Sequence, residues 1–245
     1  MTKTILITGG SGKVGKQLVN HFSNMGFKVV FTSRNEDNIK EVVNNRENIF
    51  GIEIDLLEDD FISKLMKTLK EQNLQIDYLI NNARCLDFLK VEDDFTIKRE
   101  NWVNEYLIDV IVPYELSINL AKNMSLKKII NIASIYGVVT FNPNLYTNGY
   151  NPSLQYSCAK ASLIHLTKEL AVFFADKNIQ VNSISFGGIE GRVDEEFKQR
   201  YAQLCPSKRM MKEEETIGAV DFLISEKSAY ITGQNIVVDG GWSIW

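Results

Sequence analysis

Short apolar runs alternate with segments of helical spacing from one end of the chain to the other. Seven short runs rich in isoleucine and valine are bounded by turn residues, and they lie at 4–8, 28–32, 48–54, 77–81, 128–133, 180–185 and 235–239. Apolar residues at consecutive positions are typical of strands that are buried on both faces of a parallel sheet. The runs therefore predict a parallel sheet of about seven strands.

The segments between these runs place apolar residues on one face of a helix. In 13–25, for example, Val14, Leu18, Val19 and Phe22 fall on one stripe. Similar spacing recurs at 58–72, 101–123, 155–177 and 213–225. Strands and helices in alternation predict an α/β fold, a doubly wound parallel sheet with helices on both faces.

Residues 1–245 are expected to form one domain, because the sequence contains no Pro/Gly/Ser-rich linker and no repeat. Two stretches are too irregular for the alternating pattern, 137–154 and 187–211. Both follow predicted strands, and ligands bind outside the carboxyl ends of the strands in an open α/β sheet. We expect these two stretches to be substrate loops.

The first predicted strand runs directly into the sequence TGGSGKVG, in which Gly9, Gly12 and Gly15 precede the helix. The tight turn needs a positive φ, and a pyrophosphate approaches the backbone closely only where a Cβ is missing. The start of the helix adds free N–H groups and a partial positive charge. The loop therefore predicts a Rossmann-type dinucleotide site.

The end of the second predicted strand indicates which dinucleotide binds. Sites for NAD(H) place Asp or Glu there to bond the ribose 2′-hydroxyl. Here the strand ends in Thr32 and Ser33, followed by the cation Arg34, and Lys13 adds a second cation in the glycine loop. A 2′-phosphate favours such a pair of cations, so we expect NADP(H) rather than NAD(H).

Net charge, apolar content and cysteine spacing argue against binding to nucleic acid, insertion into a membrane and a metal site. The net charge of −4 gives no basic surface for nucleic acid. No apolar stretch approaches the roughly 20 residues that a membrane-spanning helix needs, and the N-terminus lacks the features of a signal peptide. Three cysteines show no metal-ligand spacing. We expect a cytoplasmic protein with reduced thiols, no metal, and a small molecule as its substrate.

Seven motifs, in order, resemble those of the short-chain dehydrogenase/reductase family, in its compact single-domain branch. They are TGGSGKVG, IDL with Asp55, NNAR (81–84), NIASIYG, YSCAK, VNSISFGG and ITGQNIVVDGG. The resemblance implies an oxidoreductase that is a homodimer or homotetramer. It also implies cofactor contacts from Gly9, Ser11, Gly12, Lys13, Val14, Gly15, Arg34, Asp55, Leu56, Asn82, Ala83, Tyr156, Lys160, Gly187 and Ile189.

The catalytic residues that the family pattern implies are Ser134, Tyr156 and Lys160, with Asp109 in the place of an asparagine. Tyr156 and Lys160 are spaced i, i+4 on a predicted helix, so they share a face. A free phenol titrates near pH 10, and a neighbouring ammonium stabilises the phenolate. Tyr156 can then exchange a proton with a carbonyl or hydroxyl oxygen, which Ser134 would hold in place. Asp109 is expected to bring a negative charge near Lys160 without breaking the proton relay.

The sequence leaves the substrate open. The loop 137–154 is rich in Asn and Tyr. Together with the run SIYGVV, it resembles the same region in family members that are associated with the modification of surface glycans and flagellin sugars. We therefore expect a sugar or sugar derivative, with Arg84, Tyr146 and Tyr150 as its contacts. A more apolar cleft would instead indicate a ketoreductase for an apolar or aromatic ketone. A dinucleotide-binding sensor or scaffold without turnover is the third possibility.

Overall fold

The computed structural model describes residues 2–146, 151–191 and 193–244, so Tyr150 lies outside the described residues. Seven parallel strands form one sheet in the order β3-β2-β1-β4-β5-β6-β7, which confirms the predicted Rossmann-like α/β fold. The strands are β1 (Thr4–Ile7), β2 (Lys28–Ser33), β3 (Ile49–Glu53), β4 (Tyr78–Asn81), β5 (Lys128–Ser134), β6 (Gln180–Phe186) and β7 (Asn235–Val238).

The strand order reverses between β1 and β4, which are paired neighbours. The chain leaves β1 toward β2 on one side and returns after β3 to add β4 on the other side. The loops that follow β1 and β4 therefore diverge, and a crevice opens between them at the carboxyl ends of the strands. This is the edge at which the glycine loop and NNAR lie.

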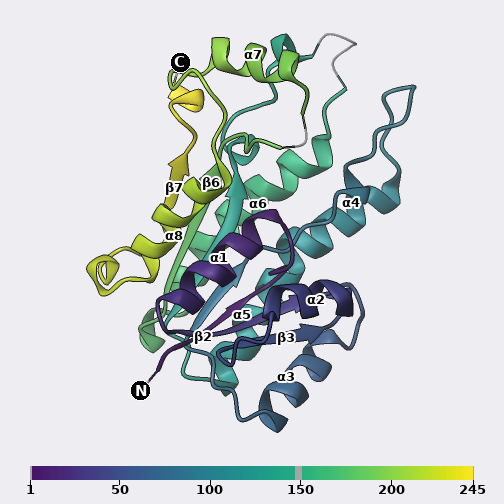
Figure 1. The fold of residues 1–245 in the computed structure, drawn as a ribbon. Helices are drawn as coiled ribbons and strands as arrows, with labels where there is room; N and C mark the ends of the chain where they lie inside the picture. Colours follow the sequence, from purple (N-terminus) through teal and green to yellow (C-terminus); the bar gives the residue numbers. More distant parts are fainter. Residues whose placement is uncertain (1, 147–150, 192, 245) are drawn as a thin grey trace.

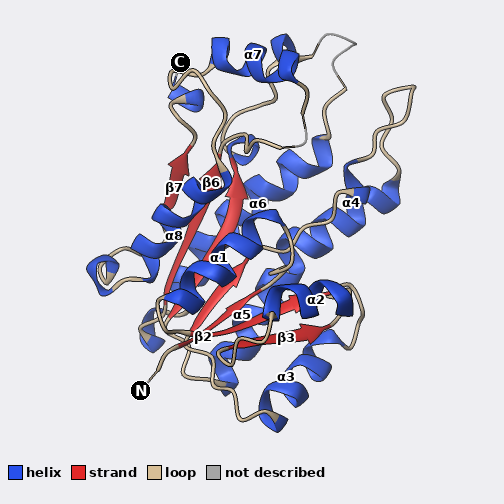
Figure 2. Ribbon diagram, in the orientation of Figure 1, coloured by secondary structure: helices blue, strands red, loops and turns tan. Residues whose placement is uncertain are grey.

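Helices cover both faces of the sheet, as Figures 1 and 2 show. One face packs against α1 (Lys13–Asn24), α2 (Glu36–Val43) and α8 (Ile217–Ile224). The other face packs against α3 (Phe61–Glu71), α5 (Val112–Asn123) and α6 (Leu154–Phe173). Alternate strand residues supply the two cores: Ile5 and Ile7 belong to the first, and Leu6 to the second. This arrangement explains why the strands are apolar at consecutive positions.

The single helix predicted over 101–123 is interrupted. The structure has α4 (Arg99–Tyr106), a π-helical turn (Leu107–Ile111) and then α5. Pro113 stands at the start of α5 and has no N–H to donate to the carbonyl of Asp109, so a regular α-helix cannot run through this point. The wider turn accommodates the break, and it carries the side chain of Asp109 into the interior.

A third apolar cluster lies beyond the carboxyl edge of the sheet, under α7 (Glu195–Leu204) at the top of Figure 1. Tyr201 of α7 stacks on Trp242, with 4.4 Å between ring centroids. Its hydroxyl accepts a hydrogen bond from the N–H of Gly188 at 2.9 Å. The cluster therefore fixes the start of the stretch 187–211, which sequence reasoning treated as irregular.

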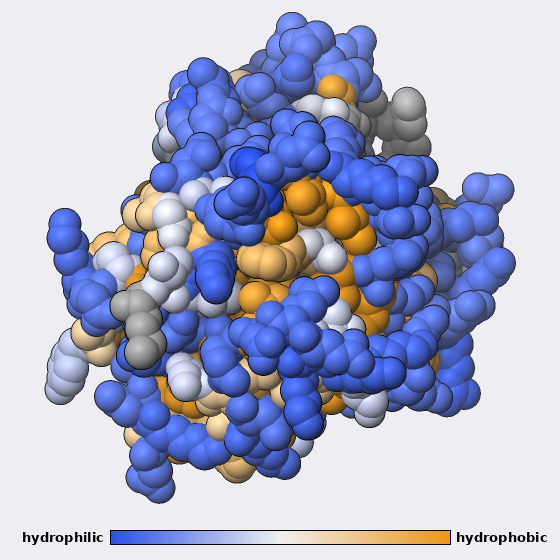
Figure 3. Space-filling view, turned by 60° about the horizontal axis from the view of Figure 1, so that its bottom comes forward, coloured by the Kyte–Doolittle hydropathy of each residue, from blue (hydrophilic) through white to orange (hydrophobic). Residues whose placement is uncertain are grey.

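On the face drawn in Figure 3, hydrophobic residues gather near the centre of the view and hydrophilic residues surround them. Among the helices of the described residues, none has the length and apolar content to cross a membrane.

Candidate active site

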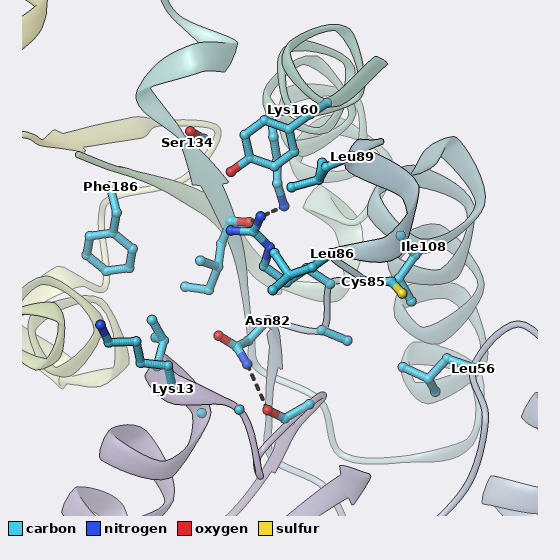
Figure 4. Close-up of a pocket in the computed structure, with 18 of the residues that line it drawn as sticks. Lys13, Leu56, Asn82, Cys85, Leu86, Leu89, Ile108, Ser134, Lys160 and Phe186 are labelled. Carbon is cyan, nitrogen blue, oxygen red and sulfur yellow. Dashed lines mark hydrogen bonds between the residues drawn. The ribbon is translucent and has the colours of Figure 1, made fainter. Parts of the chain in front are cut away.

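A cavity of about 790 Å³ lies at the carboxyl edge of the sheet and runs from the glycine loop to Tyr156 (Figure 4). Its volume falls in the upper part of the range usual for ligand sites. It brings together the glycine loop, the ends of β2 and β5, the NNAR segment and the start of α6. Of the sequence-predicted residues, it is lined by Gly9, Ser11, Gly12, Lys13, Val14, Gly15, Arg34, Asp55, Leu56, Asn82, Ala83, Arg84, Ser134, Tyr156, Lys160, Gly187 and Ile189.

The glycine loop has the conformation that a phosphate cradle needs. Gly9 has a φ of +65°, and a Cβ built on it would lie 2.9 Å from the Cα of Ala83. Its N–H donates to Thr32 Oγ1 at 3.1 Å, which ties the loop to the end of β2. Helix α1 begins at Lys13, directly after Gly12, so its first N–H groups face the cavity. This arrangement fits the pyrophosphate of a dinucleotide.

The two cations predicted to hold a 2′-phosphate have different neighbours. Arg34 is exposed after β2, and its Nη1 lies 3.9 Å from the sulfur of Cys85. Lys13 extends toward Phe186 in Figure 4, and its Nζ pairs with Glu213 at 3.1 Å. Arg34 is therefore the cation at the end of β2, whereas Lys13 belongs with the segment before α8.

The NNAR segment is held against the glycine loop by Thr8. The hydroxyl oxygen of Thr8 accepts from the N–H groups of Asn82 and Ala83, each at 2.9 Å. The amide of Asn82 donates back to the carbonyls of Thr8 and Gly9, at 2.9 and 3.2 Å. Nearby, Asp55 accepts from the N–H of Leu57 at 3.0 Å. These hydrogen bonds hold in place Asp55, Asn82 and Ala83, which line the cavity.

Ser134, Tyr156 and Lys160 meet at the far end of the cavity. Ser134 ends β5, and its hydroxyl oxygen accepts from the N–H of Tyr136 at 3.2 Å. On α6, Lys160 Nζ lies 5.8 Å from the centroid of the Tyr156 ring. The guanidinium carbon of Arg84 lies 5.1 Å from the same centroid. Two cations therefore flank the phenol that the sequence indicates as the acid.

Lys160 is held from behind by two acceptors. Its Nζ donates to Asp109 Oδ1 at 2.9 Å and to the carbonyl of Ile132 at 3.0 Å. Both partners of the ion pair are buried, with side-chain exposures of 6% for Lys160 and 1% for Asp109. The carboxylate in the place of the family's asparagine thus contacts the ammonium directly.

Sequence reasoning missed Glu105, which lies beside Asp109 and is also buried. Burial and the charge of Asp109 raise the pKa of Glu105 to about 8, against the opposing effects of Lys160 and Arg84. The signal in the sequence was the i, i+4 spacing of two acids in a segment otherwise read as an amphipathic helix. The spacing alone could not show that both acids face the interior.

The substrate end of the cavity is apolar and aromatic. It is lined by Leu86, Leu89, Tyr136, Phe141 and Phe186, and the rings of Tyr136 and Phe141 stack with centroids 3.9 Å apart. Burial raises the pKa of Tyr136 well above its ordinary value. In Figure 4, Leu89 is drawn beside Lys160 and Leu86 below it. Polar side chains stand beside this apolar surface, because Arg84, Asp87 and Ser153 also line the cavity.

Tyr146, one of the substrate contacts predicted from the loop 137–154, packs on Phe197 of α7 with ring centroids 6.1 Å apart, in the third apolar cluster. Its side chain is also in hydrogen-bonding contact with Tyr136, which lines the cavity. Asn142 accepts from the N–H of Asn144 at 3.0 Å and caps a short 3₁₀ turn. The amides of this part of the loop serve turn formation, which Asn commonly does. Arg84 is exposed at the rim of the cavity.

Comparison with known proteins agrees with this geometry. Residues 11–243 match the family model described as enoyl-(acyl carrier protein) reductase. The chain is 32% identical to a 3-oxoacyl-(acyl-carrier-protein) reductase of Buchnera aphidicola subsp. Schizaphis graminum, over 98% of this chain and 96% of that protein. It is 30% identical to the post-translational flagellin modification protein A of Campylobacter coli, over 99% and 98% of the two chains. A solved structure of a short chain dehydrogenase from Leptospira borgpetersenii with bound NAD⁺ has a TM-score of 0.87 and 31% identity, over 100% of this chain and 94% of that one.

Proposed function

The chain belongs to the short-chain dehydrogenase/reductase family, and from that premise we propose that it transfers hydride between NADP(H) and the carbon of a ketone or the corresponding alcohol. It is an oxidoreductase acting on CH–OH and C=O groups. The proposal concerns the cofactor, the residues that move the proton, and the substrate. It includes the homodimeric or homotetrameric state that the family resemblance implies, and the cytoplasmic location that the sequence predicts.

Tyr156, Ser134 and Lys160 carry the proposed chemistry. A bound nicotinamide supplies or accepts the hydride. Tyr156 gives a proton to the carbonyl oxygen during reduction and takes it from the hydroxyl during oxidation. Ser134 donates a hydrogen bond to the same oxygen and positions it. The ammonium of Lys160, whose Nζ lies 5.8 Å from the centroid of the Tyr156 ring, stabilises the phenolate that remains after proton transfer.

The preference for NADP(H) rests on the end of β2. This strand ends at Ser33, whose hydroxyl lies 2.8 Å from that of Ser11, and Arg34 follows. No carboxylate stands at Thr32 or Ser33 to bond a ribose 2′-hydroxyl, and the guanidinium matches a 2′-phosphate. Because Lys13 pairs with Glu213, we assign the discrimination between NADP(H) and NAD(H) to Arg34.

The lining of the catalytic end favours a ketone with an apolar or aromatic group beside the carbonyl. Leu86, Leu89, Phe141 and Phe186 provide surface that an apolar group can fill, and burying such surface is favourable. Arg84 at the rim would bind a carboxylate or phosphate elsewhere on the substrate. A keto-sugar is the second candidate. The Campylobacter coli relative, which is named for flagellin modification, supports it.

A panel of ketones read through NADPH oxidation tests the proposal. It should contain aryl and alkyl ketones with and without a carboxylate, together with keto-sugars and their phosphates. We expect the highest kcat/KM for an apolar ketone that carries an anionic group, and a lower dissociation constant for NADPH than for NADH. Selective turnover of keto-sugars would contradict an apolar ketone as the substrate and support a keto-sugar instead. Tighter binding of NADH would overturn the cofactor assignment.

A further inference from the structure

A second buried carboxyl group lies next to the ion pair of Asp109 and Lys160. Glu105 is in the last turn of α4, and its exposure is 1%, the same as that of Asp109. The side chains of Glu105 and Asp109 are in hydrogen-bonding contact. In the described part of the chain, no donor reaches Glu105 Oε2 or Asp109 Oδ2. Two carboxyl groups thus meet in the interior, each with an oxygen that lacks a donor.

The charges around this pair do not balance if both carboxyls are ionised. Three charged groups face Glu105: Asp109 on the π-helical turn, Lys160 on α6, and Arg84 on the loop after β4. Lys160 is the buried cation, whereas Arg84 is exposed and its charge is screened by water. Two carboxylates beside one buried ammonium would leave an uncompensated negative charge, which is costly. A proton on one carboxyl removes that charge and makes the group a donor to its neighbour.

We propose that Glu105 and Asp109 share one proton and together form a single, exchangeable counterion for Lys160. At neutral pH the proton resides on Glu105 and the charge on Asp109. When the charge of Asp109 is removed, Glu105 ionises in its place. Glu105 is a positioning residue, because it acts through Asp109 and Lys160 and reaches neither cofactor nor substrate.

The raised pKa of Glu105 is consistent with this arrangement, since burial and the charge of Asp109 are its two largest causes. Above that pKa the pair carries two negative charges, and Lys160 then stabilises the phenolate of Tyr156 less well. The pH profile of kcat/KM should therefore contain an ionisation that belongs to the pair rather than to Tyr156. This kinetic consequence rests on the proposed function, whereas the shared proton does not.

Two single variants and their combination test the exchange of roles. Glu105→Gln keeps the shape and neutrality of the protonated acid, so kcat/KM at pH 7 should stay within about threefold. Asp109→Asn should stay within about tenfold, because Glu105 then supplies the carboxylate. The double variant leaves a buried ammonium without a counterion, and its loss should exceed the product of the single losses by at least about tenfold. A double variant whose loss equals that product would overturn the proposal.

The same variants separate a proton-sharing role from a merely structural one. The wild-type pH profile should show an ionisation that is absent from Glu105→Gln, while the dissociation constant of NADPH stays the same. Superimposable pH profiles would contradict the shared proton.

Infrared difference spectroscopy locates the proton without any substrate. The wild-type protein should show the carbonyl stretch of a protonated carboxyl group at about pH 6.5 and lose it by about pH 9.5. The band should be absent from Glu105→Gln, and at about pH 6.5 it should also be absent from Asp109→Asn, in which Glu105 is ionised. A band that persists in Glu105→Gln, or no band in the wild type, refutes the inference. Failure of every ketone to react would affect the proposed function and leave this result intact.

Discussion

Replacing Gly137 by alanine should slow catalysis by displacing the helix that carries Lys160. Gly137 ends the short 3₁₀ turn after Ser134 and lies against α6. A Cβ built on it would lie 2.8 Å from the backbone carbon of Lys160 and 2.9 Å from the nitrogen of Ala161. Carbon atoms in ordinary contact are about 3.5 Å apart, so turn and helix must separate by about 0.7 Å.

The size of the effect follows from that displacement. Overpacking of this kind costs about 1–3 kcal/mol, which corresponds to a melting temperature lowered by about 2–12 °C in a chain of this length. A misplacement of about 1 Å can cost 10²-fold in rate, so kcat should fall by about 10- to 100-fold. NADPH binding should change much less, because Gly137 is not in the glycine loop.

Gly218→Ala provides the matched control. Gly218 lies in α8, and a Cβ built there meets nothing within 4 Å. Alanine in a helix is favoured over glycine by up to about 1 kcal/mol, so this variant should be at least as stable as the wild type and equally active. Thermal denaturation and NADPH oxidation with the best ketone of the panel measure both variants. If Gly137→Ala retained the kcat and the melting temperature of the wild type, the account of how Ser134 and Lys160 are held together would be refuted.

Two more predictions concern the cofactor and the carboxyl pair. Arg34→Gln should raise the dissociation constant of NADPH by about 10- to 150-fold, because it removes a charge-assisted hydrogen bond, and should leave that of NADH within about threefold. Fluorescence titration measures both constants. An equal change for both cofactors would contradict the role of Arg34. The pKa of Glu105 rises on folding from 4.5 to about 8, so its stabilising effect is complete below 4.5 and lost as the pH rises to about 8. Relative to Glu105→Gln, the free energy of unfolding of the wild type should fall over that window by up to about 1.4 kcal/mol per pH unit, as urea denaturation at several pH values can measure; parallel curves would contradict it.

The fold was predictable because the apolar pattern of each strand indicates which of its faces are buried. Ile5, Leu6 and Ile7 are apolar without alternation because helices cover both faces of the sheet. The break in the helix 101–123 also had a local cause, since Pro113 stands four residues after Asp109. The glycine loop was readable because its chemistry depends on backbone conformation, which nearby residues determine.

Other parts of the site depend on contacts between segments that are distant in the sequence. Lys13 is directed by Glu213, 200 residues later, so its distance from Arg34 could not be inferred from the glycine loop. Tyr146 lies in the loop before the catalytic tyrosine but packs on Phe197 of α7. The burial of Glu105 depends on how α4 packs beside α6. Side-chain direction in these cases is a property of the assembled fold.

The most direct test of the account compares Tyr156→Phe with Tyr136→Phe, since both phenols line the cavity. Turnover of the best ketone should fall by about 10²- to 10⁴-fold in Tyr156→Phe, the usual worth of a general acid, while NADPH binds as in the wild type. Tyr136→Phe should keep turnover within about tenfold. Undiminished turnover in Tyr156→Phe, or a collapse confined to Tyr136→Phe, would contradict the central claim that Tyr156 is the acid.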